Sequence, residues 1–173
     1  MVKKNMRILY YIHSLSVGGA ETLITSYLLS LKELGNDVTL VVNTEENTFL
    51  HQMLREQNIP MLSLRKKHHV LLFDYAELAL RKLFGYKSKW KKIYRDIEPD
   101  VVHIHTFCDA FELCDFDPNR VFYTFHSNVE RSLSMGSKKN FRKLCKFAEM
   151  GMSFTALSRA MLADIKEKIK TDK

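Results

Sequence analysis

The sequence predicts a three-layer α/β domain built on a mostly parallel β-sheet. Short, nearly continuous apolar runs alternate with longer segments in which apolar residues recur every three or four positions. This alternation is typical of repeated strand–helix–strand units. The chain has 173 residues and 46% hydrophobic content, which suits one domain with a buried core. We therefore expect residues 1–173 to form a single domain.

The first half of the chain predicts two strand–helix units. The strand Arg7–Ile12 is almost entirely apolar, as expected of a strand covered on both faces by helices. A polar, glycine-containing turn follows, and then a helix whose apolar side chains repeat at intervals of three and four. Gly35-Asn36 predicts the end of that helix. The next strand and helix are expected at Val38–Val42 and Thr48–Gln57.

The second half continues the alternation. Pro60 at the start of a weaker strand, Ile59–Leu64, indicates an edge position, because proline cannot donate a hydrogen bond to a neighbouring strand. A long helical stretch, Val70–Ile97, is expected to break near Gly85. Three further strands are expected at Val101–His105, Val121–Phe125 and Met152–Leu157, followed by a helix with Ser158 as its N-cap.

Right-handed crossovers between these elements give the strand order 3-2-1-4-5-6, a Rossmann-like arrangement. Ligands of such sheets bind at the carboxyl ends of the strands, where the strand order reverses. Polar groups and glycines follow four of the predicted strands, namely His13, Ser14, Gly18 and Gly19, then His105 and Thr106, then His126, Ser127 and Asn128, and finally Ser158. We therefore expect one rim of the sheet to carry the functional site.

Two features of this rim have more than one interpretation. Gly18-Gly19 at a helix start would let a ligand approach the backbone, and amides there favour an anion such as phosphate, but a tight turn without a ligand fits equally well. His126 could hydrogen-bond a sugar hydroxyl or a developing negative charge, or it could hold the loop that follows it. We expect His103 and His105 to project to opposite faces, with His103 in the core and His105 near the cleft.

Composition limits the partners without choosing one. A net charge of +7 attracts nucleic acid, anionic lipid or phosphorylated ligands alike. No nucleic-acid-binding module is recognisable, so we expect no nucleic-acid partner. The His68-His69 pair lacks further ligands at metal-site spacing, so no metal site is expected. Three cysteines without a CxxC pair favour reduced thiols and a cytoplasmic protein.

A basic and aromatic stretch follows Gly85. This stretch could bind an anionic membrane through its cations and its indole ring, namely Lys87, Lys89, Trp90, Lys91 and Lys92. The protein would then be peripheral on the inner face of the membrane. The alternative is a solvated helix face with Trp90 and Tyr94 in the core.

The order of these motifs resembles glycosyltransferase family 4, whose members have the GT-B fold. Residues 7–21, in which a glycine pair and Ala20-Glu21 follow the first strand, resemble the opening of that family. Residues 99–105, 123–127 and 154–158 resemble its fourth, fifth and sixth strands, in the same order.

The resemblance implies the acceptor-binding N-terminal half of a retaining glycosyltransferase. Such an enzyme moves a sugar from a nucleotide sugar to a glycan or lipid-linked acceptor, in polysaccharide or glycolipid synthesis. By position, Gly18 and Gly19 would line the cleft near the donor phosphate, His126 would contact the transferred sugar, and Glu21 would cap or orient the turn. No cofactor is implied, because the nucleotide sugar is a substrate. The C-terminal donor domain lies outside these 173 residues, so we expect the isolated chain to be inactive.

Two other hypotheses remain open. The domain could be a non-catalytic Rossmann module that binds a nucleotide or a phosphorylated metabolite. It could also be a peripheral membrane or scaffold protein that uses its positive surface.

Overall fold

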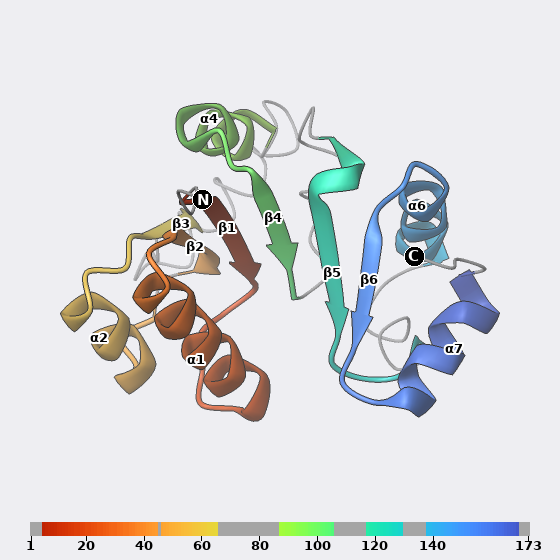
Figure 1. The fold of residues 1–173 in the computed structure, drawn as a ribbon, viewed down its shortest axis with the longest axis horizontal. Coiled ribbons are helices and arrows are strands. Elements are labelled where there is room, and N and C mark those ends of the chain that lie inside the picture. The colour runs from red at the N-terminus through yellow and green to blue at the C-terminus, as the bar shows by residue number, and fades with distance from the viewer. Residues whose placement is uncertain (1–4, 45, 66–86, 106–116, 130–137, 170–173) are drawn as a thin grey trace, which may run out of the picture.

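The computed structural model contains one six-stranded sheet in the order β3-β2-β1-β4-β5-β6 (Figure 1). Every pairing between neighbouring strands is parallel. The structure describes residues 5–44, 46–65, 87–105, 117–129 and 138–169. The strands are β1 Arg7–Ile12, β2 Asp37–Thr44, β3 Met61–Arg65, β4 Val101–Ile104, β5 Val121–Phe125 and β6 Ser153–Ala156. The predicted fold class and strand order are confirmed.

Helices cover both faces of this sheet. Within the described residues they are α1 Gly19–Glu33, α2 Phe49–Glu56, α4 Lys87–Ile97, α6 Lys138–Glu149 and α7 Arg159–Ile169, with a short 3-10 helix, η2 Pro118–Arg120, before β5. In Figure 1, α1 and α2 lie beside the half of the sheet that contains β1 to β3, whereas α6 and α7 lie beside β6.

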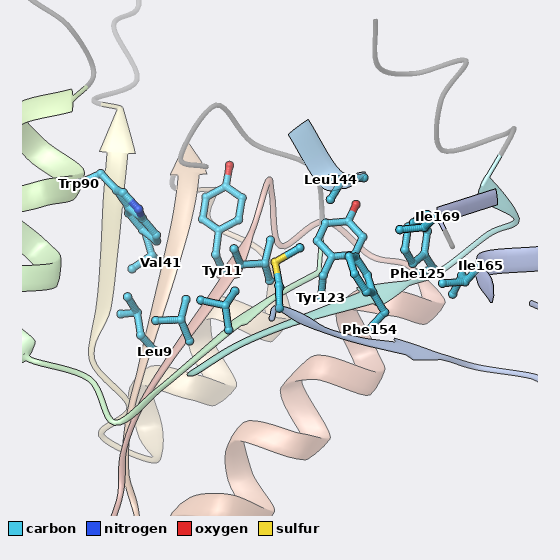
Figure 2. Close-up of a cluster of buried hydrophobic side chains, with 14 of the residues drawn as sticks. Leu9, Tyr11, Val41, Trp90, Tyr123, Phe125, Leu144, Phe154, Ile165 and Ile169 are labelled. Carbon is cyan, nitrogen blue, oxygen red and sulfur yellow. The ribbon is translucent and has the colours of Figure 1, made fainter. Parts of the chain in front are cut away.

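The alternating side chains of β1 enter two separate apolar cores. Tyr10 and its neighbours at even positions pack with α1 and α2. Leu9 and Tyr11 pack with α4, α6 and α7 through residues such as Trp90 and Leu144 (Figure 2). A strand buried on both faces must be apolar throughout, which explains the continuous apolar run in the sequence.

The predicted helix ends and edge strand are confirmed. Gly35 has φ +85° just beyond the end of α1, a backbone conformation that glycine adopts without strain. Thr48 caps α2 by accepting a hydrogen bond from the His51 amide. β3 lies at the edge of the sheet, directly after Pro60. Of the predicted stretch Val70–Ile97, only α4 lies within the described residues.

The basic helix α4 does not present its tryptophan to solvent. Trp90 is 2% exposed, and its ring lies edge-on to Tyr11 with the centroids 5.6 Å apart. Tyr94 packs against the same core. The alternative with Trp90 and Tyr94 in the core is therefore confirmed, and the membrane-facing position of Trp90 was wrong, because positions 90, 93, 94 and 97 share the buried face of the helix. Lys89, Lys91 and Lys92 are exposed.

Some predicted features fall outside the part of the chain that the structure describes, namely His68, His69, Thr106, Cys108, Cys114 and the side chain of Lys87. Among the described helices, none is long and apolar enough to cross a bilayer.

Candidate functional site

The parallel sheet brings the predicted site residues to one edge. Because β1, β4, β5 and β6 all run in the same direction, the loops that follow them leave from the same side of the sheet. A backbone hydrogen bond of 2.9 Å from His105 to Tyr11 continues the pairing of β4 with β1 up to this edge. His13 is exposed there, and Ser14 is half-buried.

The turn between β1 and α1 is closed by a carboxylate from its own helix. The Ser16 hydroxyl donates to Glu21 Oε1 at 3.3 Å. A Cβ at Gly18 would collide with the same carboxylate, although the backbone there is extended and unstrained. Nothing lies within 4 Å of a Cβ placed at Gly19. A side chain at position 18 would thus have to displace the Glu21 carboxylate, which is the far end of a flexible side chain.

This arrangement bears on the predicted anion site. Gly18 is the N-cap of α1 and offers no side chain to the amides of the first turn. Those amides favour an anion, but Glu21 already places a negative charge in that turn. Anion binding by Gly18 and Gly19 therefore stays a prediction, and a bound phosphate would have to compete with this carboxylate.

A buried histidine holds the same turn from the side of α2. The Thr48 hydroxyl donates to the Leu15 carbonyl at 2.8 Å, and His51 Nδ1 lies 2.9 Å from that hydroxyl. His51 Nε2 accepts from the Glu46 amide at 3.4 Å, so Nδ1 carries the hydrogen and donates to Thr48. His51 is fully buried, and the sequence analysis did not single it out.

At the ends of β4 and β5 two imidazoles form a hydrogen-bonded pair. His105 Nδ1 lies 3.0 Å from His126 Nε2. Tyr10 of β1 stacks on the His105 ring, with centroids 5.4 Å apart and planes inclined by 15°. His105 is 2% exposed, which places the pair against the sheet rather than in open solvent. The outer nitrogens, His105 Nε2 and His126 Nδ1, are buried and have no hydrogen-bond partner among the described residues.

His103 and His105 share a face, so the prediction that they project to opposite faces was wrong. Their ring centroids are 4.1 Å apart. Alternation in a strand sends positions i and i+2 to the same side, and only the residue between them points the other way. The expected core position of His103 is confirmed in part, because its side chain is half-buried beside Tyr10.

A row of hydroxyl groups continues from His103 across the next two strands. His103 Nε2 lies 2.7 Å from Thr124 Oγ1, and Thr124 Oγ1 lies 2.5 Å from Thr155 Oγ1. Thr124 is buried, whereas Thr155 is exposed. The row therefore connects the histidine cluster with the surface over β6.

Burial keeps these histidines neutral near pH 7. It lowers the pKa of His103 to about 4, with a smaller contribution from His126. Burial, together with the neighbouring imidazoles, lowers the pKa of His105 to about 2. The pKa of His126 is also lowered by burial, and the charge of Glu21 acts in the opposite direction. A neutral imidazole offers one donor and one acceptor, which suits the orientation of a hydroxyl-bearing ligand.

The electrostatic influence of Glu21 on His126 connects the two parts of the site. In the parallel sheet β4 lies between β1 and β5, so the loops that follow β1 and β5 leave from the same edge. A Cβ at Gly18 would meet the Glu21 carboxylate, so the glycine turn lies beside the charge that acts on His126.

The loop after His126 is anchored by the last helix. The Val129 amide donates to Asp164 Oδ2 at 2.7 Å, and Asp164 Oδ1 pairs with Lys168 at 2.7 Å. This contact holds one end of the segment with Ser127 and Asn128, which are half-buried and exposed, respectively. Their roles stay predictions.

Ser158 has a structural use in this conformation. Its hydroxyl accepts from the Met161 amide at 3.2 Å, as predicted for an N-cap of α7. Its hydroxyl is thus already engaged, and a role for Ser158 in binding substrate stays a prediction. In the described residues no group of three or more His, Cys, Asp or Glu side chains is arranged to hold a metal ion.

Several members of the cluster were missed in the sequence. Tyr10 and Thr124 lie inside apolar strands, where they resemble ordinary strand residues. The available signal was positional: polar side chains on one face near the carboxyl ends of adjacent parallel strands.

Comparison with known proteins gives one family. The profile described as Glycosyltransferase Family 4 matches residues 17–173. No curated protein sequence matches the chain significantly.

Solved structures share the fold at low sequence identity. A glycosyltransferase from Rickettsia africae ESF-5 has a TM-score of 0.60 at 16% identity, over 98% of this chain and 41% of that one. HepE from Anabaena, solved with UDP and glucose, has a TM-score of 0.63 at 16% identity, over 95% and 41%. WaaG, a glycosyltransferase involved in lipopolysaccharide biosynthesis, has a TM-score of 0.56 at 12% identity, over 95% and 42%. This chain thus spans about two-fifths of the length of each.

Proposed function

Because the chain belongs to glycosyltransferase family 4, we propose that residues 1–173 are the acceptor-side domain of a retaining glycosyltransferase. The enzyme would move a sugar from a nucleotide sugar to a glycan or lipid-linked acceptor, without a metal or organic cofactor. The matched relatives are more than twice as long as this chain, which supports a second domain that supplies the donor site. The observation that carries the proposal is the pair His105 and His126 at the same sheet edge as the Gly18 turn.

In this proposal His126 is the catalytic residue that touches the transferred sugar. A neutral imidazole can hydrogen-bond a sugar hydroxyl or an oxygen on which negative charge develops. Gly18 and Gly19 would let the substrate approach the backbone, and His13 and Ser14 would line the same cleft. Thr106, Ser127 and Asn128 belong to the loops that leave the same edge and are proposed as acceptor contacts.

The acceptor class follows from charge. Lys89, Lys91 and Lys92 are exposed cations on α4 and would suit a lipid-linked acceptor at an anionic surface. We place the protein in the cytoplasm, peripheral to the inner face of the membrane. Flotation with vesicles that contain anionic lipid should recover the chain, and replacing the three lysines by alanine should abolish recovery. Equal recovery with purely zwitterionic vesicles would contradict this part of the proposal.

Turnover by a longer polypeptide tests the activity itself. A protein that contains this chain followed by a donor domain should release nucleoside diphosphate from one member of a panel of nucleotide sugars. The 173-residue chain alone should release none, because the groups that stabilise the leaving diphosphate would lie on the other domain. The anomeric configuration of the product, read by NMR, should match that of the donor. No release by the longer protein with any donor would refute the proposal.

A second candidate is a nucleotide-binding module without catalysis. The observation that favours it is the N-terminus of α1, where Gly18 leaves the first-turn amides without a side-chain cap. Calorimetric titration of the 173-residue chain with UDP and with free phosphate separates the two. Micromolar binding of UDP by this chain alone favours the module, and its absence favours the acceptor-side domain.

A further inference from the structure

We propose that His105 is a positioning residue that fixes the orientation and the tautomer of His126, so that the two imidazoles act as one neutral dyad. The inference rests on the proposed function for its catalytic meaning. The geometry that carries it is the 3.0 Å contact between His105 Nδ1 and His126 Nε2, with the outer nitrogens buried and unpartnered.

A single hydrogen lies between the two inner nitrogens. If it belongs to His105 Nδ1, then neutral His126 carries its own hydrogen on Nδ1 and presents a donor there. If it belongs to His126 Nε2, the Nδ1 atom of that ring is a bare acceptor and His105 Nε2 is a donor. The two outer nitrogens therefore always have opposite roles, and His105 decides which role His126 plays.

The surroundings of His105 favour the first of these states. Its Nε2 atom has no hydrogen-bond partner within the part of the chain that the structure describes. His126 Nδ1 is buried and without a partner as well, so either state leaves one N–H group without an acceptor. His126 is half-buried whereas His105 is only 2% exposed, so a ligand can supply the missing acceptor more readily at His126 Nδ1 than at His105 Nε2. The hydrogen of His105 then lies on Nδ1 and is donated to His126. His126 is left with an Nδ1–H group, which suits an acceptor oxygen on a sugar.

The packing around His105 prevents the ring from choosing another orientation. Tyr10 stacks on its face, and the ring of His103 lies 4.1 Å away, centroid to centroid. His103 is in turn held by Thr124 at 2.7 Å. Among the described residues, Glu21 is the charged group that acts on His126, and His126 in turn acts on His103 and His105. Because the orientation of the His105 ring is fixed, its hydrogen bond fixes the orientation and tautomer of His126. The groups that hydrogen-bond the other ring nitrogen of metal-bound or catalytic histidines act in the same way.

Nitrogen NMR of histidine side chains in the 173-residue chain tests the dyad without any activity assay. At pH 7.5 the two-bond proton–nitrogen correlations should show both His105 and His126 as the Nδ1–H tautomer. In His105→Leu, the signal of His126 should move towards the Nε2–H form that free histidine prefers. His105→Asn keeps a donor near the position of Nδ1 and should restore the original tautomer. Gln52→Leu, which replaces an exposed side chain of α2, is the control and should leave His126 unchanged.

The kinetic arm uses the longer polypeptide with a donor domain. His105→Leu should lower kcat about tenfold to a hundredfold with little change in KM, and His105→Asn should recover most of the loss. An Nε2–H tautomer at His126 in the wild-type chain overturns the inference even if a variant fails to fold. So does an unchanged His126 spectrum in His105→Leu. Expected tautomers without any sugar transfer would instead overturn the proposed function and leave the dyad as a structural feature.

Discussion

Acidification should destabilise the fold through the buried histidines. Burial lowers the pKa of His103 to about 4 and that of His105 to about 2, from an ordinary value of 6.5. Near pH 5 the unfolded chain therefore binds protons at both residues, whereas the folded chain does not. The stability that depends on the neutral rings is complete above about pH 6.5 and is lost as the pH falls towards the folded pKa values.

The size of the effect follows from these values. Protonation at pH 5.0 stabilises an unfolded histidine of ordinary pKa by about 2 kcal/mol. A folded histidine whose pKa is about 4 or lower gains almost nothing at that pH. His103 and His105 together should thus lower the free energy of unfolding by about 4 kcal/mol between pH 7.5 and pH 5.0. This is a large part of the stability of an ordinary domain, about 5–15 kcal/mol.

Urea unfolding at constant ionic strength measures this loss. The chain contains a single tryptophan, Trp90, whose buried ring makes its fluorescence a direct probe of the core. In His105→Asn the loss between pH 7.5 and pH 5.0 should be smaller by about 2 kcal/mol, since one of the buried groups no longer titrates. His13→Asn, which replaces an exposed histidine, is the control and should keep the full loss. A free energy of unfolding that stays constant over this pH range would refute the reasoning.

Three further predictions concern single contacts, and each can be measured by urea unfolding at pH 7.5. Trp90→Ala should lower the free energy of unfolding by about 3–5 kcal/mol, because it empties the core between α4 and Tyr11; a change below about 1 kcal/mol would contradict this packing. Gly19→Ala should stabilise the chain by about 0.4–1 kcal/mol, since nothing lies near the added methyl group, whereas Gly18→Ala must displace the Glu21 carboxylate and should not stabilise it; equal gains at both positions would show that the carboxylate does not close the turn. Asp164→Ala should cost about 1–3 kcal/mol, because it leaves the Val129 amide without its acceptor, and an unchanged stability would show that this contact does not hold the loop.

The positions of the strands were predictable from burial on both faces, and their order from right-handed crossovers. Strands covered on both faces must be apolar along their length, and β1 and β2 show this in the sequence. Helix ends were predictable for a similar reason. Gly35 adopts a positive φ just beyond the end of α1, and Ser158 caps the start of α7. Both are positions that these residue types favour in helices generally.

The inner part of the site was harder to predict because it depends on contacts between distant segments. The Val129 amide finds Asp164 only once α7 has docked, and no local pattern marks the pair. The same holds for the contact of Thr48 with the Leu15 carbonyl, which joins α2 to the loop after β1. The shared face of His103 and His105 was a different case, since the two-residue period of a strand already contains that information.

The central claim is that His126, at the edge shared by β1, β4 and β5, faces the sugar that is transferred. The most direct measurement is kcat for sugar transfer by the longer polypeptide that carries His126→Ala, beside Gln52→Ala, which removes an exposed side chain of α2. We expect kcat to fall about a hundredfold in the first variant, with the fold intact, and to stay unchanged in the second. Transfer by His126→Ala at the wild-type rate would contradict the claim.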